Sequence, residues 1–300
     1  MGPLSEANTA FCLALFKQLD EDKKSSNVFY SPLSISSALA MVMLGARANT
    51  ATQILHRSPV PALTLICFDC PQCLKAQDDV HVKFSKLIKE LNKAGAPYSL
   101  SLANRLYGDQ SYQFVEVCMS VHLYVPIWAV KTHCVGQILE LPYKGKDLSM
   151  LIFLPYEMED DTTGLEKLEK ELTYEKFVEW TQPHKMYTVE VDVGLPRFKM
   201  EESYNLKDIL TRMGMVDAFD VRMSDFSGMS PANDLVLSQV VHKAFVEVNE
   251  EGTKAAAATT SDIMLCCGIP TFIADHPFLF FIRHKPSMSV LFAGRFCSPA

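Results

Sequence analysis

Residues 241–268 read Val-His-Lys-Ala-Phe-Val-Glu-Val-Asn-Glu-Glu-Gly-Thr-Lys-Ala-Ala-Ala-Ala-Thr-Thr-Ser-Asp-Ile-Met-Leu-Cys-Cys-Gly. The first part completes a pattern that predicts a strand over 236–248. The alanine tract favours a helix, because alanine is the best helix former. However, Gly252 lies upstream and the β-branched Thr259 and Thr260 lie downstream, so this helix would be too short to be stable alone. We therefore interpret the tract as an exposed loop that follows a strand.

The loop also has the side-chain pattern of a segment that can become a central strand of a sheet. Such a strand needs small side chains on its buried face. Every second residue of the tract is small, and these residues are Thr253, Ala255, Ala257 and Thr259. Lys254 would point outward, and Gly252 supplies the backbone freedom of a hinge. The acidic pair Glu250 and Glu251 favours a solvated edge until the loop moves.

The composition is that of a folded globular protein. The 300 residues are 48% hydrophobic and 21% charged, which excludes disorder, collagen and coiled coil. The net charge of −7 is mild, and no cluster of lysine and arginine indicates a nucleic-acid surface or a polybasic membrane patch. We therefore expect no nucleic-acid partner.

Other features of the chain indicate a reducing compartment and no membrane span. The longest charge-free stretch, 25–46, contains several serines, one asparagine and one proline, so it is not a continuous apolar span. Residues 1–16 lack the basic start and apolar segment of a secretory signal. The nine cysteines are an odd number, and no asparagine begins a glycosylation sequon. We expect a cytoplasmic protein that does not contact membranes.

Periodicity along the chain predicts an α+β fold with mostly antiparallel sheets. Ser31 as N-cap and Pro32 as first helical residue predict the start of a helix, and Gly45 predicts its end. Apolar residues at helical spacing predict helices over 7–19, 32–45, 80–91, 165–180 and 204–213. Alternating patterns or apolar runs predict strands over 98–103, 148–154, 187–193 and 236–248. No linker divides the chain, so we expect one domain over 1–300.

The sequence lacks the common catalytic motifs. No Gly-x-Gly pair is available to cradle a phosphate. The nearest match to a nucleophile elbow, residues 228–232, lacks the second glycine and contains a proline. No histidine is followed by glutamate, so the zinc-protease pair is also missing. We expect neither enzymatic activity nor a cofactor.

One motif in the sequence suggests a metal site, and it consists of Cys67, Cys70 and Cys73. Their spacing offers three thiolates to zinc or to an iron–sulfur cluster, with His56 or His81 as a fourth ligand. The alternative is a surface loop, because turn-forming residues separate the cysteines and no second ligand pair follows. We favour the loop and expect no metal.

Several longer motifs, which span both ends of the chain in family order, resemble those of the serpins. They are Asn27-Val28-Phe29-Tyr30-Ser31-Pro32-Leu33-Ser34-Ile35, Leu195-Pro196-Arg197-Phe198-Lys199-Met200-Glu201, residues 241–253, Asp275-His276-Pro277-Phe278, and Leu291-Phe292-Ala293-Gly294-Arg295-Phe296. More narrowly, the chain is similar to the leaderless, intracellular, ovalbumin-type branch (clade B). The resemblance implies the serpin fold with an exposed reactive-centre loop, and a main sheet that is incomplete in this chain.

The resemblance implies a suicide-substrate inhibitor of serine proteases, in which the cleaved loop inserts into the main sheet. Its hinge would comprise Glu250, Glu251, Gly252, Thr253, Lys254, Ala255, Ala256, Ala257 and Ala258. The family's hinge length places the reactive bond between Cys266 and Cys267, with Leu265 as the alternative. Cys266 would suit an elastase-like protease, whereas Leu265 or Met264 would suit a chymotrypsin-like one. The vicinal cysteines also offer an alternative role as a redox handle.

The chain departs from the family between Phe114 and Gln137. The family would have several dozen further residues there, namely two helices and the strand beside which the loop inserts. Only residues 115–136 stand in their place, and they match no family motif that we identify. Altered splicing or an error in the gene model would explain such a stretch. Residues 56–79 are also atypical, and Ala48 replaces an expected glycine.

The absence of these family residues between Phe114 and Gln137 gives an alternative to protease inhibition. Without the insertion strand, the protein would be a protease substrate or a non-inhibitory interaction protein on the same scaffold. A shortened sheet would also expose unpaired strand edges. We expect a monomer.

Overall fold

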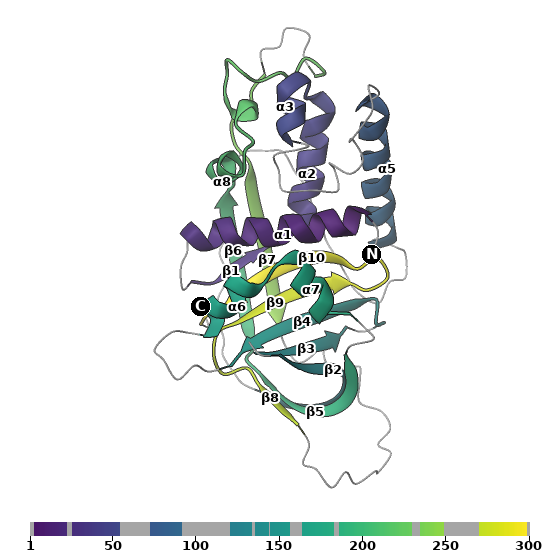
Figure 1. The fold of residues 1–300 in the computed structure, drawn as a ribbon, viewed down its shortest axis with the longest axis vertical. Coiled ribbons are helices and arrows are strands. Elements are labelled where there is room, and N and C mark those ends of the chain that lie inside the picture. The colour runs from purple at the N-terminus through teal and green to yellow at the C-terminus, as the bar shows by residue number, and fades with distance from the viewer. Residues whose placement is uncertain are drawn as a thin grey trace.

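The computed structural model describes residues 3–22, 26–54, 73–91, 121–133, 136–143, 145–156, 164–182, 186–229, 235–248 and 270–298. These residues form a curved sheet, a separate two-stranded ribbon and groups of helices around them (Figure 1). The combination confirms the predicted α+β class. No helix in these ranges is both long enough and apolar enough to span a membrane.

The curved sheet has eight strands in the order β1-β10-β9-β4-β3-β2-β5-β8. Its strands are β1 (Val28–Tyr30), β2 (Val121–His133), β3 (Gly136–Pro142), β4 (Leu148–Pro155), β5 (Tyr187–Leu195), β8 (Thr271–Ile273), β9 (Phe278–His284) and β10 (Ser289–Phe296). Only β5 and β8 pair in parallel among these strands. The ribbon consists of β6 (Phe198–Asn205) and β7 (Val241–Val248), which pair antiparallel. The pairing is therefore mostly antiparallel, as predicted.

Helices cover one face of the curved sheet and extend beyond it. The helices are α1 (Pro3–Asp22), α2 (Pro32–Gly45), α3 (Ala48–Thr52), α5 (Cys73–Leu91), α6 (Gly164–Glu171), α7 (Tyr174–Trp180), α8 (Lys207–Arg212) and the short 3₁₀ helix η3 (Asp217–Phe219). Helix α1 lies across β1 and β10, while α2, α3 and α5 gather at one end of the molecule (Figure 1). The side chain of Asn8 holds α1 to the sheet by donating to the carbonyl of Val290 at 2.6 Å.

The core has two parts, one on each side of the curved sheet. The first lies between the sheet and the helices. The second lies between the sheet and the ribbon, and it is built largely from aromatic rings, including Phe29, Phe198, Phe278, Phe280 and Phe296. The rings of Phe198 and Phe296 lie 4.9 Å apart between centroids. Because buried aromatic side chains contribute strongly to stability, this cluster fixes the ribbon against the sheet.

The helix that follows Tyr30 forms as predicted. The Ser31 hydroxyl accepts a hydrogen bond from the backbone N–H of Ser34 at 3.2 Å, which is the expected N-cap, and α2 ends at Gly45. Apolar residues at helical spacing, which predicted this helix, are buried, namely Ile35, Leu39, Val42 and Ala46. Strands β4 and β5 confirm the predictions over 148–154 and 187–193. The strand predicted over 98–103 lies outside the described residues.

Other predicted elements have different bounds in the structure. The helix predicted over 165–180 is two helices, because Thr173 interrupts it and caps α7 by accepting from the N–H of Lys176. The helix predicted over 204–213 begins later, since Tyr204 is held in the ribbon opposite His242. Strand β7 begins at Val241 rather than at residue 236. Helix α5 begins at Cys73, before the predicted residue 80, and the short helix α3 was not predicted.

The atypical stretch 115–136 contains strand β2, to which sequence analysis assigned no element. Strand β2 pairs antiparallel with β3 on one side and with β5 on the other. It therefore joins β3 and β4 to β5 and β8 within one sheet.

Candidate functional site

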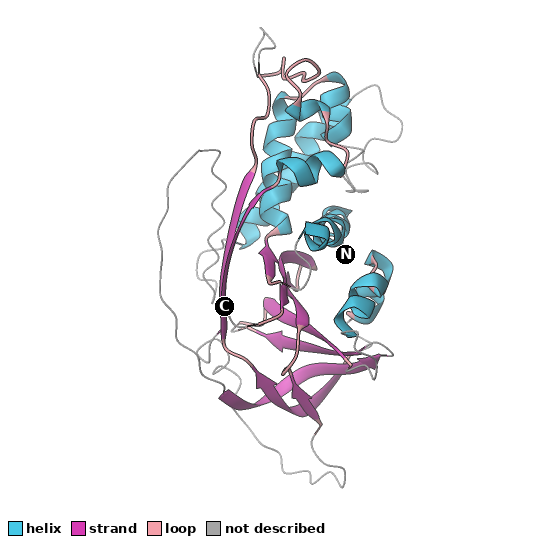
Figure 2. Ribbon diagram, turned by 90° about the vertical axis from the view of Figure 1, so that its left-hand side faces the viewer, coloured by secondary structure: helices cyan, strands magenta, loops and turns pink. Residues whose placement is uncertain are grey.

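The ribbon leads directly into the predicted hinge. Its strands alternate between buried and exposed residues, so that His242, Ala244 and Val246 of β7 face the aromatic core. On the other face, Val241 and Phe245 are about half exposed, at 55% and 49%. Figure 2 shows the ribbon as two long strands that stand apart from the curved sheet and run beside the helices. The alternation in the sequence produces this geometry, because successive strand residues point to opposite faces.

Strand β7 has an outer edge on the side away from β6. In the part of the chain that the structure describes, β6 is the one strand paired with β7. The backbone N–H and C=O groups of the other edge are therefore placed to accept a further strand. Since β7 ends at Val248 and the predicted hinge begins at Glu250, the hinge continues from the strand that carries this edge.

One hydrogen bond fastens the ribbon to the start of α2, and a second joins the same residue to β10 of the curved sheet. The backbone N–H of Ser31 donates to Nε2 of His242 at 3.0 Å, and the Ser31 hydroxyl donates to the carbonyl of Leu291 at 2.7 Å. Burial lowers the pKa of His242 to about 4. The imidazole is therefore neutral at physiological pH and accepts at Nε2. On β6, the hydroxyl of Tyr204 accepts from the N–H of Phe29 at 3.1 Å.

From residue 270 the chain is described again, and there it is bonded to β5 of the curved sheet. The carbonyl of Pro270 accepts from the N–H of Asp192 at 2.9 Å, and the N–H of Ala274 donates to the carbonyl of Gly194 at 2.8 Å. Between them, Phe272 is fully buried in the aromatic core. We call residues 270–277 the return limb. Residues 249–269 thus connect two fixed points, the end of β7 and the return limb.

The predicted site residues themselves lie outside the described residues. These are the hinge Glu250, Glu251, Gly252, Thr253, Lys254, Ala255, Ala256, Ala257 and Ala258, and the reactive-bond residues Leu265, Cys266 and Cys267. Cys67, Cys70 and His56 also lie outside, as do the side chains of Cys73 and His81 in α5. Within the described ranges, no group of three or more His, Cys, Asp or Glu residues is placed to hold a metal.

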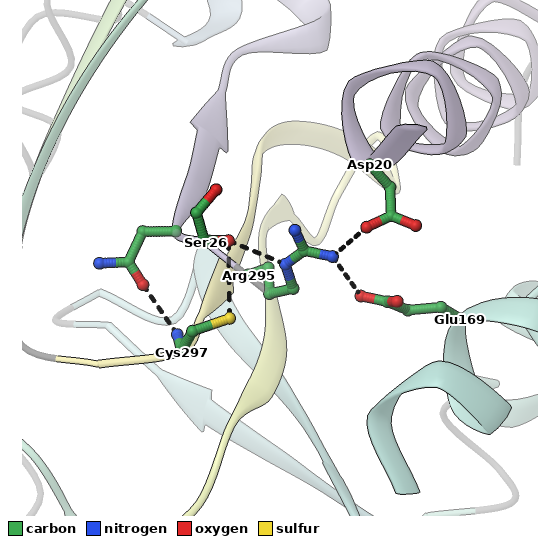
Figure 3. A network of polar contacts seen from close by, with 6 residues as sticks. Asp20, Ser26, Glu169, Arg295 and Cys297 are labelled. Atoms are coloured by element: carbon green, nitrogen blue, oxygen red, sulfur yellow. Dashed lines mark hydrogen bonds and ion pairs between the residues drawn. The ribbon is translucent and has the colours of Figure 1, made fainter. Parts of the chain in front are cut away.

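Sequence reasoning missed a buried charged network around Arg295, shown in Figure 3. The guanidinium of Arg295 from β10 contacts Asp20 of α1 and, at 3.0 Å, Glu169 of α6. Its Nε donates to the carbonyl of Ser26 at 3.0 Å. Burial opposes the charge of Arg295, but these carboxylates outweigh it and raise its pKa. Arg295 lies in the motif of residues 291–296 quoted above, but the spacing of that motif does not indicate which side chains Arg295 contacts.

A single family accounts for the whole fold. The family described as "Serpin (serine protease inhibitor)" matches residues 6–124 and 119–299. The chain therefore belongs to the serpin family.

The relatives found place it in the ovalbumin-type branch. It is 39% identical to leukocyte elastase inhibitor of Equus caballus and 37% identical to that of Homo sapiens, with 100% of both chains covered in each case. It is 39% identical to Serpin B6 of Macaca fascicularis, again over 100% of both chains. Among solved structures, uncleaved ovalbumin is 29% identical with a TM-score of 0.67, covering 99% of this chain and 100% of that one. Maspin is 25% identical with a TM-score of 0.76, covering 99% and 98%. These findings confirm the resemblance and the fold predicted from it.

The comparisons also bear on the atypical stretch. The alignment with the Equus caballus protein runs over 393 residues against the 300 of this chain, a difference of 93. The family match stops and restarts at residues 119–124, inside the stretch 115–136. The two matched segments overlap within that stretch, and the expectation that it replaces a central block of the family stays a prediction. What distinguishes the chain is the division of the family match, together with the 93 alignment positions that it leaves empty.

Proposed function

We propose that this serpin inhibits serine proteases as a suicide substrate. The serine Oγ of the protease attacks the carbonyl carbon of Cys266, and the peptide bond to Cys267 breaks. The amine of Cys267 leaves with a proton from the protease's histidine, and an ester joins Cys266 to the protease. The freed hinge then adds to the outer edge of β7 as a new strand, before water can hydrolyse the ester.

The observation that carries this proposal is the continuity of β7 with the hinge. An edge strand with a single described partner leads straight into a segment whose alternate residues are small. The return limb is fixed separately on β5, so cleavage would release the hinge end while the other end stays in place. Ala244 and Val246 of β7 are buried in the aromatic core, which supports β7 as the template for the incoming strand.

The protease that we propose as target is elastase-like or chymotrypsin-like. Cys266 is small and weakly polar, as an elastase pocket requires, and Leu265 or Met264 would fit a chymotrypsin pocket. No lysine or arginine lies next to the proposed bond. The name of the relatives, leukocyte elastase inhibitor, supports the first choice.

The test is to incubate the protein with elastase-like, chymotrypsin-like and trypsin-like enzymes. We expect a band of summed mass that survives SDS with the first or second enzyme, and a released peptide that begins at Cys267. A protease whose catalytic serine is replaced by alanine is the control, since it can bind but forms no ester. Cleaved monomer alone across the whole panel would reject the proposal.

A second candidate function is a non-inhibitory serpin that proteases merely cleave. The specific observation that favours it is the 93-position difference from the elastase-inhibitor relative. In that case, cleavage of the loop would leave the melting temperature unchanged. A large rise after cleavage would contradict it, because only insertion adds a strand.

Three further properties belong to the same proposal. We propose a single domain over 1–300, a monomer and a cytoplasmic location, as the resemblance to the leaderless branch implies. Gel filtration with light scattering and fractionation of expressing cells test the last two. We also propose that the protein has no nucleic-acid or membrane partner and no enzymatic activity of its own.

A further inference from the structure

At the end of helix α2, a methionine side chain packs against a glycine. A Cβ added to Gly45 would lie only 2.1 Å from Cγ, 2.4 Å from Cε and 2.6 Å from Sδ of Met229. The thioether therefore occupies the space beside the Gly45 backbone that a side chain would otherwise fill. Gly45 is buried, whereas Met229 is 53% exposed. The methionine thus covers the end of α2 while it remains accessible to water.

The turn that carries this methionine, residues 225–229, has hydrogen bonds to the same region of the fold. The N–H of Gly228 donates to the carbonyl of Gly45 at 3.1 Å, next to the methionine contact. At the other end of the turn, the N–H of Arg47 donates to the carbonyl of Asp225 at 2.9 Å, and the N–H of Asp225 donates to the hydroxyl of Thr50 at 2.9 Å. The turn is therefore fixed at Asp225 independently of the methionine, whereas its bond at Gly228 lies beside the thioether.

The thioether of an accessible methionine is open to oxidation by peroxides. One oxygen of hydrogen peroxide bonds to Sδ, the O–O bond breaks, and the other oxygen leaves as water. The sulfur loses the two electrons that the peroxide gains. The sulfoxide carries a polar oxygen that accepts hydrogen bonds, while Gly45 presents a carbonyl oxygen that is itself an acceptor. The oxidised side chain is therefore expected to turn from Gly45 toward water.

We propose that Met229 is an oxidation site, at which peroxide releases Gly228 from the end of α2. Reductases return methionine sulfoxide to methionine, so the change is reversible. Met223 is exposed to a similar extent, at 58%, but it precedes the attachment at Asp225. Its oxidation should leave the contact with Gly45 unchanged. The site includes neither the hinge nor the return limb, so the inference goes beyond the proposed function.

The test combines oxidation of the full-length protein by hydrogen peroxide with hydrogen exchange read at single amides by mass spectrometry. We expect sulfoxide to form at Met229 and Met223 at similar rates, and about tenfold more slowly at the buried Met43. In molecules oxidised at Met229, the open population at the Gly228 amide should rise about tenfold, while that at the Arg47 amide changes less than about twofold. Reduced Met229 after treatment, unchanged exchange at Gly228, or equal rises at both amides would overturn the proposal.

Three variants separate the contact from general effects of peroxide. Met229→Leu keeps an apolar side chain without sulfur, so peroxide should leave exchange at Gly228 unchanged although Met223 still reacts. The matched control Met223→Leu should keep the full response. In Gly45→Ala the new Cβ displaces the methionine, so exchange at Gly228 should be raised before peroxide is added and rise little further. This variant decides the question even where Met229→Leu does not fold.

The same response in Met229→Leu as in the unaltered protein would reject Met229 as the site. An unraised exchange at Gly228 in Gly45→Ala would reject the role of the contact. Complex formation with a protease is not a readout of this experiment, so the oxidation site and the proposed inhibition succeed or fail separately.

Discussion

Ala48 illustrates how one residue carries strain at the start of a helix. Its φ of 47° lies in the left-handed region, which costs roughly 1–2 kcal/mol for a residue with a Cβ. The surrounding contacts hold it there: the N–H of Arg47 donates to the carbonyl of Asp225 at 2.9 Å, and the N–H of Ala51 donates to the carbonyl of Arg47 at 3.1 Å. The resemblance had already marked this position as one where the family has glycine.

We therefore expect Ala48→Gly to stabilise the protein. Glycine relieves the strain but also gains freedom in the unfolded chain, so the net effect should be about 0.5–1 kcal/mol. Urea unfolding measures it. Ala51→Gly in the same helix is the matched control and should destabilise by about 1 kcal/mol, because Ala51 has no positive φ. A loss of stability in both variants would contradict the assignment of strain.

Because His242 is buried, we expect the free energy of unfolding to fall in acid. Burial lowers the pKa of His242 to about 4. Below pH 6.5 the imidazole therefore takes up a proton in the unfolded state but not in the folded state. Stability is therefore lost as the pH falls from 6.5 toward 4, by about 3 kcal/mol in total. His242→Gln, whose amide oxygen can still accept from Ser31, should lack this component. Parallel urea titrations of the two proteins at several pH values measure the difference, and identical curves would count against it.

At the scale of elements, the proposed mechanism joins the ribbon and the hinge in one functional unit. The β7 strand is fixed by His242 and by the aromatic core, whereas its outer edge has no strand partner among the described residues. The hinge must match the pleat of this edge if it inserts. Its side chains therefore divide into an inward set, which includes Ala255 and Ala257, and an outward set, which includes Lys254 and Ala256.

A pair of adjacent substitutions tests this division. Ala257→Arg would place a long charged side chain in the buried layer, so we expect insertion to slow and the protein to become a substrate of its target. Ala256→Arg places the same side chain one residue away on the outward face and should preserve inhibition. The ratio of SDS-stable complex to cleaved monomer is the measurement. Equal ratios for the two variants would show that the predicted register of insertion is wrong.

At the scale of the whole molecule, buried arginines connect distant parts of the chain. Arg295 joins α1, α6 and β10, as Figure 3 shows, and its side chain is only 2% exposed. Arg283 of β9 is fully buried, donating to Glu140 of β3 at 2.9 Å and to the carbonyl of Thr181 after α7 at 3.3 Å. Removing one partner from such a network leaves buried charge without compensation.

Arg295→Met should therefore destabilise the protein by about 3 kcal/mol at neutral pH. Burial raises the pKa of Glu169, so part of the loss should be recovered as the pH falls and this carboxyl takes up a proton. Lys243→Met is the control, because its ion pair with Glu201 is exposed and should contribute less than about 1 kcal/mol. Thermal unfolding at pH 5 and pH 7 measures both. Equal effects of the two substitutions would contradict the role assigned to Arg295.

The sequence by itself determined the class of fold, the N-capped helix α2 and the alternation that makes the ribbon. These features follow from local periodicity, which reports directly which face of a helix or strand is buried. It also identified the family, through motifs at both ends of the chain, and the stretch where the family match is interrupted.

Only the tertiary structure decided where β2 lies, which backbone N–H binds His242 and which carboxylates surround Arg295. Asn8 and Val290, for example, are 282 residues apart in sequence but share a hydrogen bond. Such contacts depend on how helices and strands pack in space. The residues next to a polar side chain in the sequence do not indicate which distant residue it will contact. The same reason explains why β7 could be predicted as a strand, while its position at the edge of the ribbon could not.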